Sequence, residues 1–159
     1  DGSVKGWTGL GTGVSPQRLK NKISIIETGL KLHGKKFDCV YEILSAFAGR
    51  EMAAIAGSVI AARVFGIPVL LDGFISTVSG AVLTLFKRDI LDHCLISHMS
   101  SEPGHKGIIS SLKKETVLDL NMGLGEASGG AIAALVIRGA LATHNKMATF
   151  RDAGVSKKI

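Results

Sequence analysis

The sequence predicts an α/β fold in which helices flank a parallel sheet, a Rossmann-like three-layer arrangement. Short apolar runs that fit buried strands alternate with segments of helical periodicity. The composition fits this class, because 20 of the 159 residues are glycine and only 5% are aromatic. Small residues let helices pack closely on a sheet. No linker, repeat or low-complexity stretch divides the chain, so we expect residues 1–159 to form a single α/β domain.

The first third of the chain is expected to be helical after a glycine-rich loop at residues 1–14. Ser15 and Pro16 fit the N-cap and first position of a helix, and Gly34 fits its end. Asp38 can cap a second helix. The third is expected from about Arg50 to Phe65, ending at Gly66. The residues expected to face the core from these helices are Leu19, Ile23, Ile26 and Leu30; Val40, Ile43, Leu44 and Phe47; and Met52, Ile55, Val59 and Ile60.

Strands and helices alternate in the rest of the chain. The expected strands are Pro68–Asp72, His93–Ser97 and Thr116–Leu118. The expected helices are Gly73–Phe86, about Lys106–Leu112, Glu126–Ala142 and a short one within the basic tail Lys146–Ile159. In parallel sheets a ligand sits beyond the carboxyl ends of the strands. Asp72, the loop His98–Gly104 with Ser97 before it, and Met122–Glu126 should therefore gather at one edge.

The composition argues against several classes of protein. The formal charge of +6 comes from scattered lysines with no interleaved aromatic residues, which gives little support to a nucleic-acid groove. The uncharged piece Gly73–Phe86 is too short and too rich in Ser and Thr to span a bilayer. Cys39 and Cys94 make no disulfide framework. We therefore expect a cytoplasmic protein without a membrane segment.

The polar loop from His98 to His105 is a candidate phosphate site. It combines Ser100, Ser101, Glu102 and Gly104 at the entrance to a helix. Backbone N–H groups at a helix N-terminus bind phosphate well. An ordinary loop rich in capping residues is the alternative interpretation.

Three histidines, His93, His98 and His105, lie near Cys94. Their spacing matches no standard zinc pattern. Hydrogen-bonded or exposed histidines are therefore the default expectation.

Glu126 is the candidate general base. It is expected at the start of a helix rich in Ala and Gly, entered through Gly123 and Gly125. An apolar pocket raises a carboxyl pKa and a helix dipole lowers it, and a base active near pH 7 needs such a balance. An acid that only complements the helix dipole is the alternative.

Taken together, several segments resemble a known family, the nicotinate-nucleotide–dimethylbenzimidazole phosphoribosyltransferases. The segments are Gly11–Val14 with Lys22-Ile23, Gly49–Gly57, Pro68–Ile75, Ser97–His105, Leu118–Glu126 and Met147–Phe150. Of these, Ser-x-Glu-Pro-Gly-His and Leu-Gly-Glu are the specific motifs. The match covers nearly the whole chain and identifies it with the C-terminal portion of the family's larger fold.

The resemblance implies transfer of the phosphoribosyl group of nicotinate mononucleotide to 5,6-dimethylbenzimidazole, giving α-ribazole 5′-phosphate and nicotinate. It implies that Glu126 takes the benzimidazole proton and that Lys22, Ser100, Ser101 and Gly104 serve the phosphate and ribose. The other expected substrate contacts are Asp72, Glu102, Met122, Leu124 and Gly125. The resemblance implies neither metal nor cofactor. It suggests a homodimer that buries part of the Arg50–Phe65 or Gly73–Phe86 surface.

The chain departs from the family pattern in two ways. Ala127 stands where the family has Gly after the glutamate. Family members are also much longer at the N-terminus, where they carry a phosphate loop, a second glutamate and most of a small helical domain. A non-catalytic fragment or degenerate binding module with the same fold is therefore the alternative function.

Overall fold

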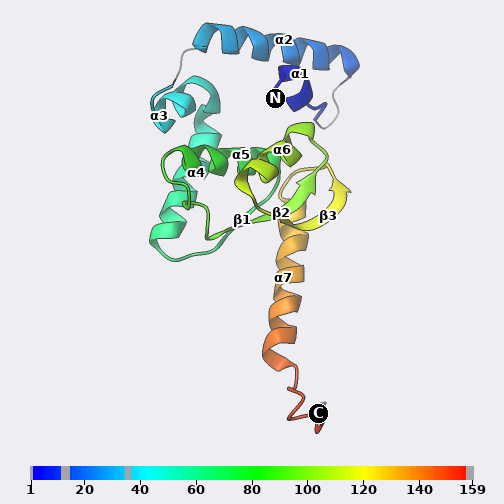
Figure 1. Ribbon diagram of the computed structural model, residues 1–159. Helices are drawn as coiled ribbons and strands as arrows, with labels where there is room; N and C mark the ends of the chain where they lie inside the picture. Colours follow the sequence, from blue (N-terminus) through cyan, green and yellow to red (C-terminus); the bar gives the residue numbers. More distant parts are fainter. Residues whose placement is uncertain (1, 12–14, 35–36, 157–159) are drawn as a thin grey trace.

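The computed structural model describes residues 2–11, 15–34 and 37–156. This part of the chain contains an open parallel sheet with the strand order β1-β2-β3, surrounded by helices (Figure 1). The strands are β1 (Val69–Leu71), β2 (Cys94–Ser100) and β3 (Thr116–Met122). Val69 pairs with Cys94, and Ile96 pairs with Thr116. The predicted α/β class with a parallel sheet is confirmed.

The helices fall before, between and after the strands, as parallel connections require. They are α1 (Val4–Trp7), α2 (Pro16–His33), α3 (Val40–Ile43), the π-helical turn η1 (Leu44–Ala48), α4 (Gly49–Val64), α5 (Phe74–Ala81), the 3₁₀ turn η2 (Val82–Leu85), α6 (Pro103–Leu112) and α7 (Ser128–Lys146). The predicted end of α2 at Gly34 is confirmed.

Two strands are longer than predicted. β2 continues through His98, Met99 and Ser100, which were expected in a loop, and β3 continues to Met122. The reason is backbone pairing, because His98 is in register with Leu118 and Ser100 with Met122 across a bulge. A prediction based on apolar runs misses this extension, because His98 and Ser100 are polar.

Both ends of the chain also differ from the prediction. Residues 4–7 form α1 inside the expected loop, where the Ser3 side chain caps the N–H of Gly6 at 3.2 Å. After α7 the chain turns at residues 150–154 and forms no further helix there. The rest of the predicted glycine loop at residues 12–14, the pair Lys35 and Lys36, and the tail lysines Lys157 and Lys158 lie outside the described residues.

The second and third of the helices predicted before β1 follow one another directly, as α3, η1 and α4. Gly49, the first residue of α4, has a φ of +67°, in the left-handed region that favours glycine. The predicted cap at Asp38 is wrong. Cys39 is the N-cap of α3, and the Asp38 backbone N–H donates to the Glu42 carboxylate at 3.0 Å.

The core lies where α4 and η2 cover the beginning of the sheet. Its buried members are Val40, Ala56, Val59, Leu71, Leu83, Ile90, Leu91 and Cys94. The prediction that Val59 faces inward is confirmed. Ile60 was also expected inside but is 42% exposed, because it lies beside an apolar surface groove of about 540 Å³ lined by Leu83 and Phe86.

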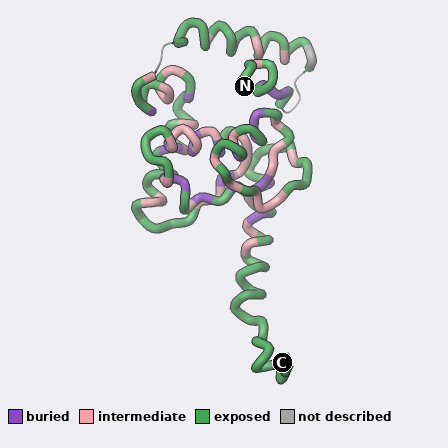
Figure 2. Tube along the Cα trace, viewed as in Figure 1, coloured by how far each residue is buried: buried purple, intermediate pink, exposed green. Residues whose placement is uncertain are grey.

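Two long helices are exposed over most of their length (Figure 2). In Figure 1, α2 lies across the top of the molecule, and α7 extends downward from the sheet. In α2, Leu19 and Ile23 are half-buried, while Leu30 is 44% exposed. In α7 burial is confined to the first turns, at Gly129 and Ala133. The first turns of α7 are thus the part that the sheet holds.

One helical run among the described residues, Val40–Val64, is long and apolar enough to cross a membrane by length and composition alone. The core helix of a soluble protein passes the same test. Here 17% of the apolar window is buried, and the run contributes Val40, Ala56 and Val59 to the core.

Candidate active site

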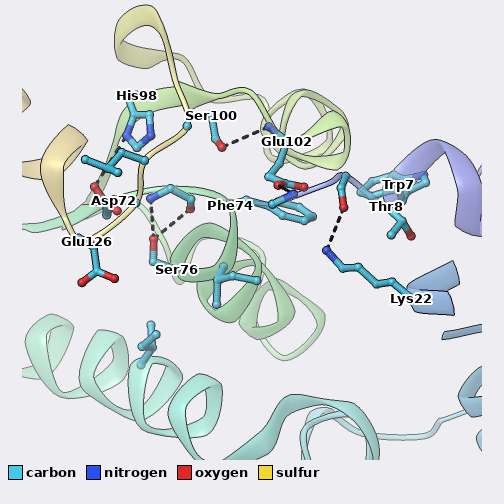
Figure 3. A pocket seen from close by; sticks show the side chains of 18 of the residues that line it. Trp7, Thr8, Lys22, Asp72, Phe74, Ser76, His98, Ser100, Glu102 and Glu126 are labelled. Atoms are coloured by element: carbon cyan, nitrogen blue, oxygen red, sulfur yellow. Dashed lines mark hydrogen bonds and ion pairs between the residues drawn. The ribbon is translucent and has the colours of Figure 1, made fainter. Parts of the chain in front are cut away.

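A pocket of about 670 Å³ lies beyond the carboxyl ends of the strands (Figure 3). Its walls come from α1, α2, α4, the ends of β1 and β2, the start of α5, and the loop before α7. The predicted site residues that line it are Lys22, Asp72, Ser100, Glu102, Leu124, Gly125 and Glu126. The expectation that these segments gather at one edge of the sheet is confirmed.

Three other predicted contacts, Ser101, Gly104 and Met122, are not among the residues that line this pocket. Gly104 is buried in the first turn of α6, where a Cβ atom would lie only 2.8 Å from Phe74. Ser101 is exposed, and its N–H donates to the Met122 carbonyl at 3.0 Å. These residues shape the wall behind the pocket, and a direct role for them in binding stays a prediction.

Two charged side chains hold the described part of the glycine loop from opposite sides. The Lys22 ammonium donates to the carbonyl of Gly9 at 3.0 Å, and the Glu102 carboxylate accepts the N–H of Gly11 at 2.9 Å. A Cβ atom at Gly9 would collide with Glu102. The glycine is therefore required for this close approach. Lys22 and Glu102, from α2 and the start of α6, position the loop at one end of the pocket.

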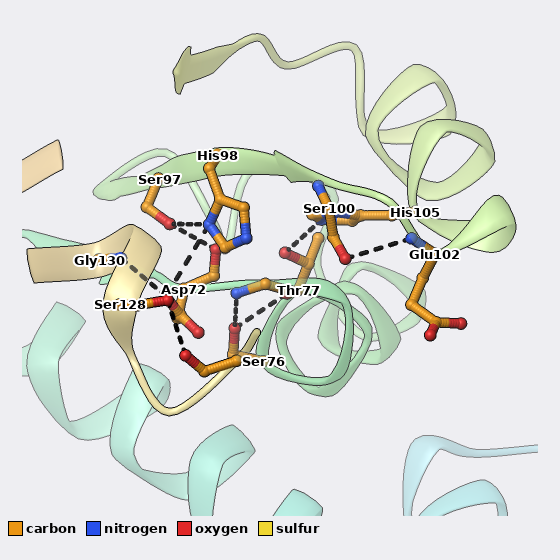
Figure 4. Close-up of polar contacts among 12 residues, drawn as sticks. Asp72, Ser76, Thr77, Ser97, His98, Ser100, Glu102, His105, Ser128 and Gly130 are labelled. Carbon is orange, nitrogen blue, oxygen red and sulfur yellow. Dashed lines mark hydrogen bonds and ion pairs between the residues drawn. The ribbon is translucent and has the colours of Figure 1, made fainter. Parts of the chain in front are cut away.

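Asp72 joins three elements at the other end of the pocket (Figure 4). Its carboxylate accepts the N–H of Gly130, in the first turn of α7, at 2.7 Å. The same Oδ1 lies 3.8 Å from Nδ1 of His98 on β2, and the Asp72 carbonyl accepts the Ser97 hydroxyl. A carboxylate at a helix N-terminus is favoured by the exposed N–H groups and the helix dipole. Asp72 thus fixes the start of α7, and with it the end of the loop that carries Glu126.

His105 is a structural residue behind the pocket. It is fully buried, its Nδ1 accepts the N–H of Ser100 at 2.9 Å, and Nε2 lies 3.0 Å from the Thr77 hydroxyl. Because Nδ1 is an acceptor, Nε2 carries the proton. Burial, and secondarily the neighbouring His98, lowers the pKa of His105 to about 4. The imidazole is therefore neutral at physiological pH.

The histidines that invited a zinc interpretation are each hydrogen-bonded. His93 Nε2 contacts the Val59 carbonyl at 3.0 Å, and His98 Nδ1 contacts the Ser97 hydroxyl at 2.9 Å. No group of three or more His, Cys, Asp or Glu side chains that could hold a metal occurs among the described residues. The default expectation of hydrogen-bonded histidines is confirmed.

Glu126 lines the pocket from a tight turn rather than from a helix. The prediction that it begins the helix is wrong, because α7 starts at Ser128. Glu126 and Ala127 both adopt left-handed backbone conformations, with φ of +57° and +58°. The Ser128 hydroxyl closes the turn by donating to the Gly125 carbonyl at 2.7 Å. The Glu126 side chain is exposed, so the predicted apolar enclosure is not formed by the described residues.

Several residues in the pocket wall did not emerge from the sequence as site residues. They include Trp7, Phe74 and Ser76, while His98 was expected only as the first residue of the polar loop at this edge. A signal existed for His98, because it follows the second predicted strand directly and so lies at the carboxyl edge. Trp7 is the single tryptophan of the chain, and only the fold brings it next to α6.

The pocket offers a carboxylate and an ammonium at its two ends, with hydroxyl and imidazole groups between them. Figure 3 shows Glu126 at one end and Lys22 at the other. Such a site suits a substrate with an anionic group at one end and a proton to lose at the other.

Comparisons with known proteins identify the family. A family model described as phosphoribosyltransferase matches residues 1–155. Nicotinate-nucleotide–dimethylbenzimidazole phosphoribosyltransferases from Rhizobium leguminosarum and Novosphingobium aromaticivorans are 46% and 48% identical over 157 and 155 residues. These alignments cover 99% and 98% of this chain and 46% of each relative. The chain thus spans about half the length of the curated relatives it matches.

The fold agrees with a solved structure. The crystal structure of CobT from Thermus thermophilus superimposes with a TM-score of 0.86 at 31% identity, covering 98% of this chain and 46% of that one. The family model, the relatives and the shared fold agree with the motifs at Ser97–His105 and Leu118–Glu126. This chain belongs to the nicotinate-nucleotide–dimethylbenzimidazole phosphoribosyltransferase family.

Proposed function

We propose that the pocket takes part in moving the phosphoribosyl group of nicotinate mononucleotide to 5,6-dimethylbenzimidazole, giving α-ribazole 5′-phosphate and nicotinate. The observation that carries the proposal is the convergence of Glu126, Lys22 and Ser100 on one pocket in a chain of this family. Relatives that bear the name of this activity share 43–48% identity with the chain.

In this proposal Glu126 removes the proton from one benzimidazole nitrogen while the other nitrogen attacks the anomeric carbon. The nicotinate ring departs from the opposite face as a neutral pyridine, because it is cationic in the mononucleotide. The reaction therefore needs chiefly positioning and one base. Glu126 is suited to that role because its carboxylate faces the pocket from a closed turn, with Leu124 and Gly125 beside it.

The other end of the pocket would receive the 5′-phosphate. Lys22 supplies the positive charge, and Ser100 supplies a hydroxyl whose oxygen accepts the Glu102 N–H at 3.3 Å. Glu102 and Asp72 act in this proposal by holding the two loops that form the walls. A phosphate that takes the Lys22 ammonium would compete with the Gly9 carbonyl, so binding is coupled to the glycine loop.

We further propose that the protein works as a cytoplasmic homodimer without a membrane or nucleic-acid partner. Support for the dimer comes from the apolar groove on α4 and η2, beside which Tyr41 and Phe86 are each 77% exposed. Apolar surface gathered in this way is typical of subunit interfaces. Static light scattering measures the mass, and a clean monomer at high concentration would contradict the dimer.

The function is tested with Glu126→Gln in the full-length protein. Gln keeps the shape and one hydrogen-bonding oxygen but cannot take the proton. Turnover of mononucleotide and benzimidazole to α-ribazole 5′-phosphate, followed by chromatography, should fall roughly 10²- to 10⁴-fold. Benzimidazole binding, measured by calorimetry, should remain.

Glu115→Gln is the matched control, because Glu115 is exposed just before β3 begins, at the end of the sheet away from the pocket. Its turnover should equal that of the parent. Parent-like turnover of Glu126→Gln would remove Glu126 from the mechanism. Binding without turnover in the parent itself would favour the binding-module alternative.

A further inference from the structure

His98 is a buried polar side chain that the reaction proposed above leaves unused. It lies on β2, is 4% exposed and lines the pocket. Its position depends on Gly129, because a Cβ atom there would overlap the imidazole ring. Most buried polar side chains have at least one hydrogen-bond partner, and His98 has one at Nδ1. The polar contacts of the described residues to His98 all go to Nδ1. Because no buried side-chain nitrogen or oxygen among them lacks a partner, Nε2 is the ring nitrogen left open to the pocket.

The contacts of Nδ1 fix where the imidazole carries its proton. The Ser97 hydroxyl donates its single hydrogen to the Asp72 carbonyl. It can therefore only accept in its 2.9 Å contact with His98 Nδ1. Nδ1 carries the hydrogen, and the carboxylate of Asp72, 3.8 Å away, favours the same arrangement. The neutral ring thus leaves Nε2 as an acceptor.

An acceptor in this place selects a donor on the ligand. Phosphate oxygens offer lone pairs and would be repelled by Nε2, whereas a hydroxyl group donates to it. Ser100 stands two residues along β2, on the same face of the strand. In Figure 3 His98 lies above Asp72 near the Glu126 end, and Ser100 lies between His98 and the Lys22 end. The ribose of a mononucleotide would occupy this middle part.

We propose that His98 binds the substrate by accepting, at Nε2, a hydrogen bond from a ribosyl hydroxyl of the mononucleotide. The inference rests on the proposed function, and it assigns the ribose to the stretch of pocket between the two charged ends. Asp72 and Ser97 act through His98, because they hold its ring in the tautomer that exposes the Nε2 lone pair.

The tautomer is tested first in the unmodified chain. Two-bond ¹H–¹⁵N spectra distinguish the two protonation sites of each of the five histidines. His98 should show a protonated Nδ1 and a bare Nε2, and His105 should show the reverse. Addition of nicotinate mononucleotide should shift the His98 Nε2 resonance upfield, as an acceptor does when it gains a hydrogen bond. A protonated Nε2 on His98 would overturn the proposal.

A pair of variants separates the two nitrogens. In His98→Asn the amide nitrogen can take the place of Nδ1 and nothing reaches the place of Nε2, while His98→Gln provides an oxygen near Nε2. The parent should bind nicotinate mononucleotide about tenfold more tightly than an analogue that lacks one ribose hydroxyl, about the effect of one hydrogen bond. His98→Asn should lose this discrimination, and His98→Gln should recover part of it.

His93→Asn is the matched control, because His93 bonds to the Val59 carbonyl away from the pocket. It should keep the full discrimination. Mononucleotide that binds without moving the His98 signal, or discrimination that survives in His98→Asn, overturns the role of His98 and leaves the proposed function standing. No mononucleotide binding by the parent overturns both.

Discussion

Acid should destabilise this protein through the protonation of His105. The ring is fully buried between Ser100 and Thr77, and burial lowers its pKa to about 4. In the unfolded chain the pKa returns to roughly 6.5. Between these values the unfolded state binds a proton that the folded state excludes. The stabilising contribution is therefore complete above about pH 6.5 and disappears as the pH falls towards 4.

The size of the effect follows from the separation of the two pKa values. One pKa unit corresponds to about 1.4 kcal/mol. The free energy of unfolding should therefore fall by about 3 kcal/mol between pH 7 and pH 4, because only the unfolded state takes up this proton. That is a large share of the stability of a typical domain. Protonation removes a specific hydrogen bond. The Nδ1 lone pair accepts the N–H of Ser100, and a protonated Nδ1 has no lone pair with which to accept it.

The assay is urea unfolding followed by circular dichroism at half-unit steps from pH 4 to pH 7.5. His105→Asn keeps an oxygen that can accept the Ser100 N–H but cannot titrate. Its free energy of unfolding should therefore fall by about 3 kcal/mol less than that of the parent over this pH range. His144→Asn is the control, because His144 is exposed on α7. Carboxylates titrate equally in all three proteins and cancel. Parallel curves for the parent and His105→Asn would refute the argument.

Two further predictions concern the pocket walls. Gly129→Ala should destabilise the fold by about 1–3 kcal/mol, because the new Cβ would overlap His98. Gly139→Ala on the same helix meets nothing within 4 Å and should stabilise the fold by up to about 1 kcal/mol. Thermal unfolding compares the two variants, and equal shifts of their melting temperatures would contradict the clash. Lys22→Ala should weaken nicotinate mononucleotide binding at least about tenfold and leave benzimidazole binding unchanged in calorimetry, because the ammonium is expected to face the phosphate. Equal weakening of both ligands would assign Lys22 to the glycine loop alone.

Local patterns were enough to predict the type of fold and the place of the pocket. The apolar runs before Asp72 and Ser97 located two of the parallel strands. Because ligands bind beyond the carboxyl ends of parallel strands, Asp72, Ser100 and Glu126 were expected to lie together, and they line one pocket. That rule needs only strand direction, which helices between successive strands determine. The family motifs then supplied roles that periodicity alone leaves open.

What the sequence could not predict depends on contacts between distant residues. Gly130 and Asp72 are 58 positions apart, and Gly11 and Glu102 are 91 apart. Neither pair has a local signature. The extension of β2 through His98 has the same origin, because pairing with β3 rather than apolar character keeps those residues in a strand. The left-handed turn at Glu126 was also missed, since glutamate and alanine rarely adopt positive φ.

The shape of α7 gives the molecule a gradient of local stability. Its first turns are held by Asp72 and by the buried Ala133, while Leu135 is already 66% exposed and Leu141 54%. Beyond that point the helix relies on its own propensity, which is marginal for so short a segment in water. Amide hydrogens should therefore exchange rapidly in the distal turns and slowly near Gly130. Fraying at the far end can therefore proceed while the first turns of α7 and the turn at Glu126 stay in place.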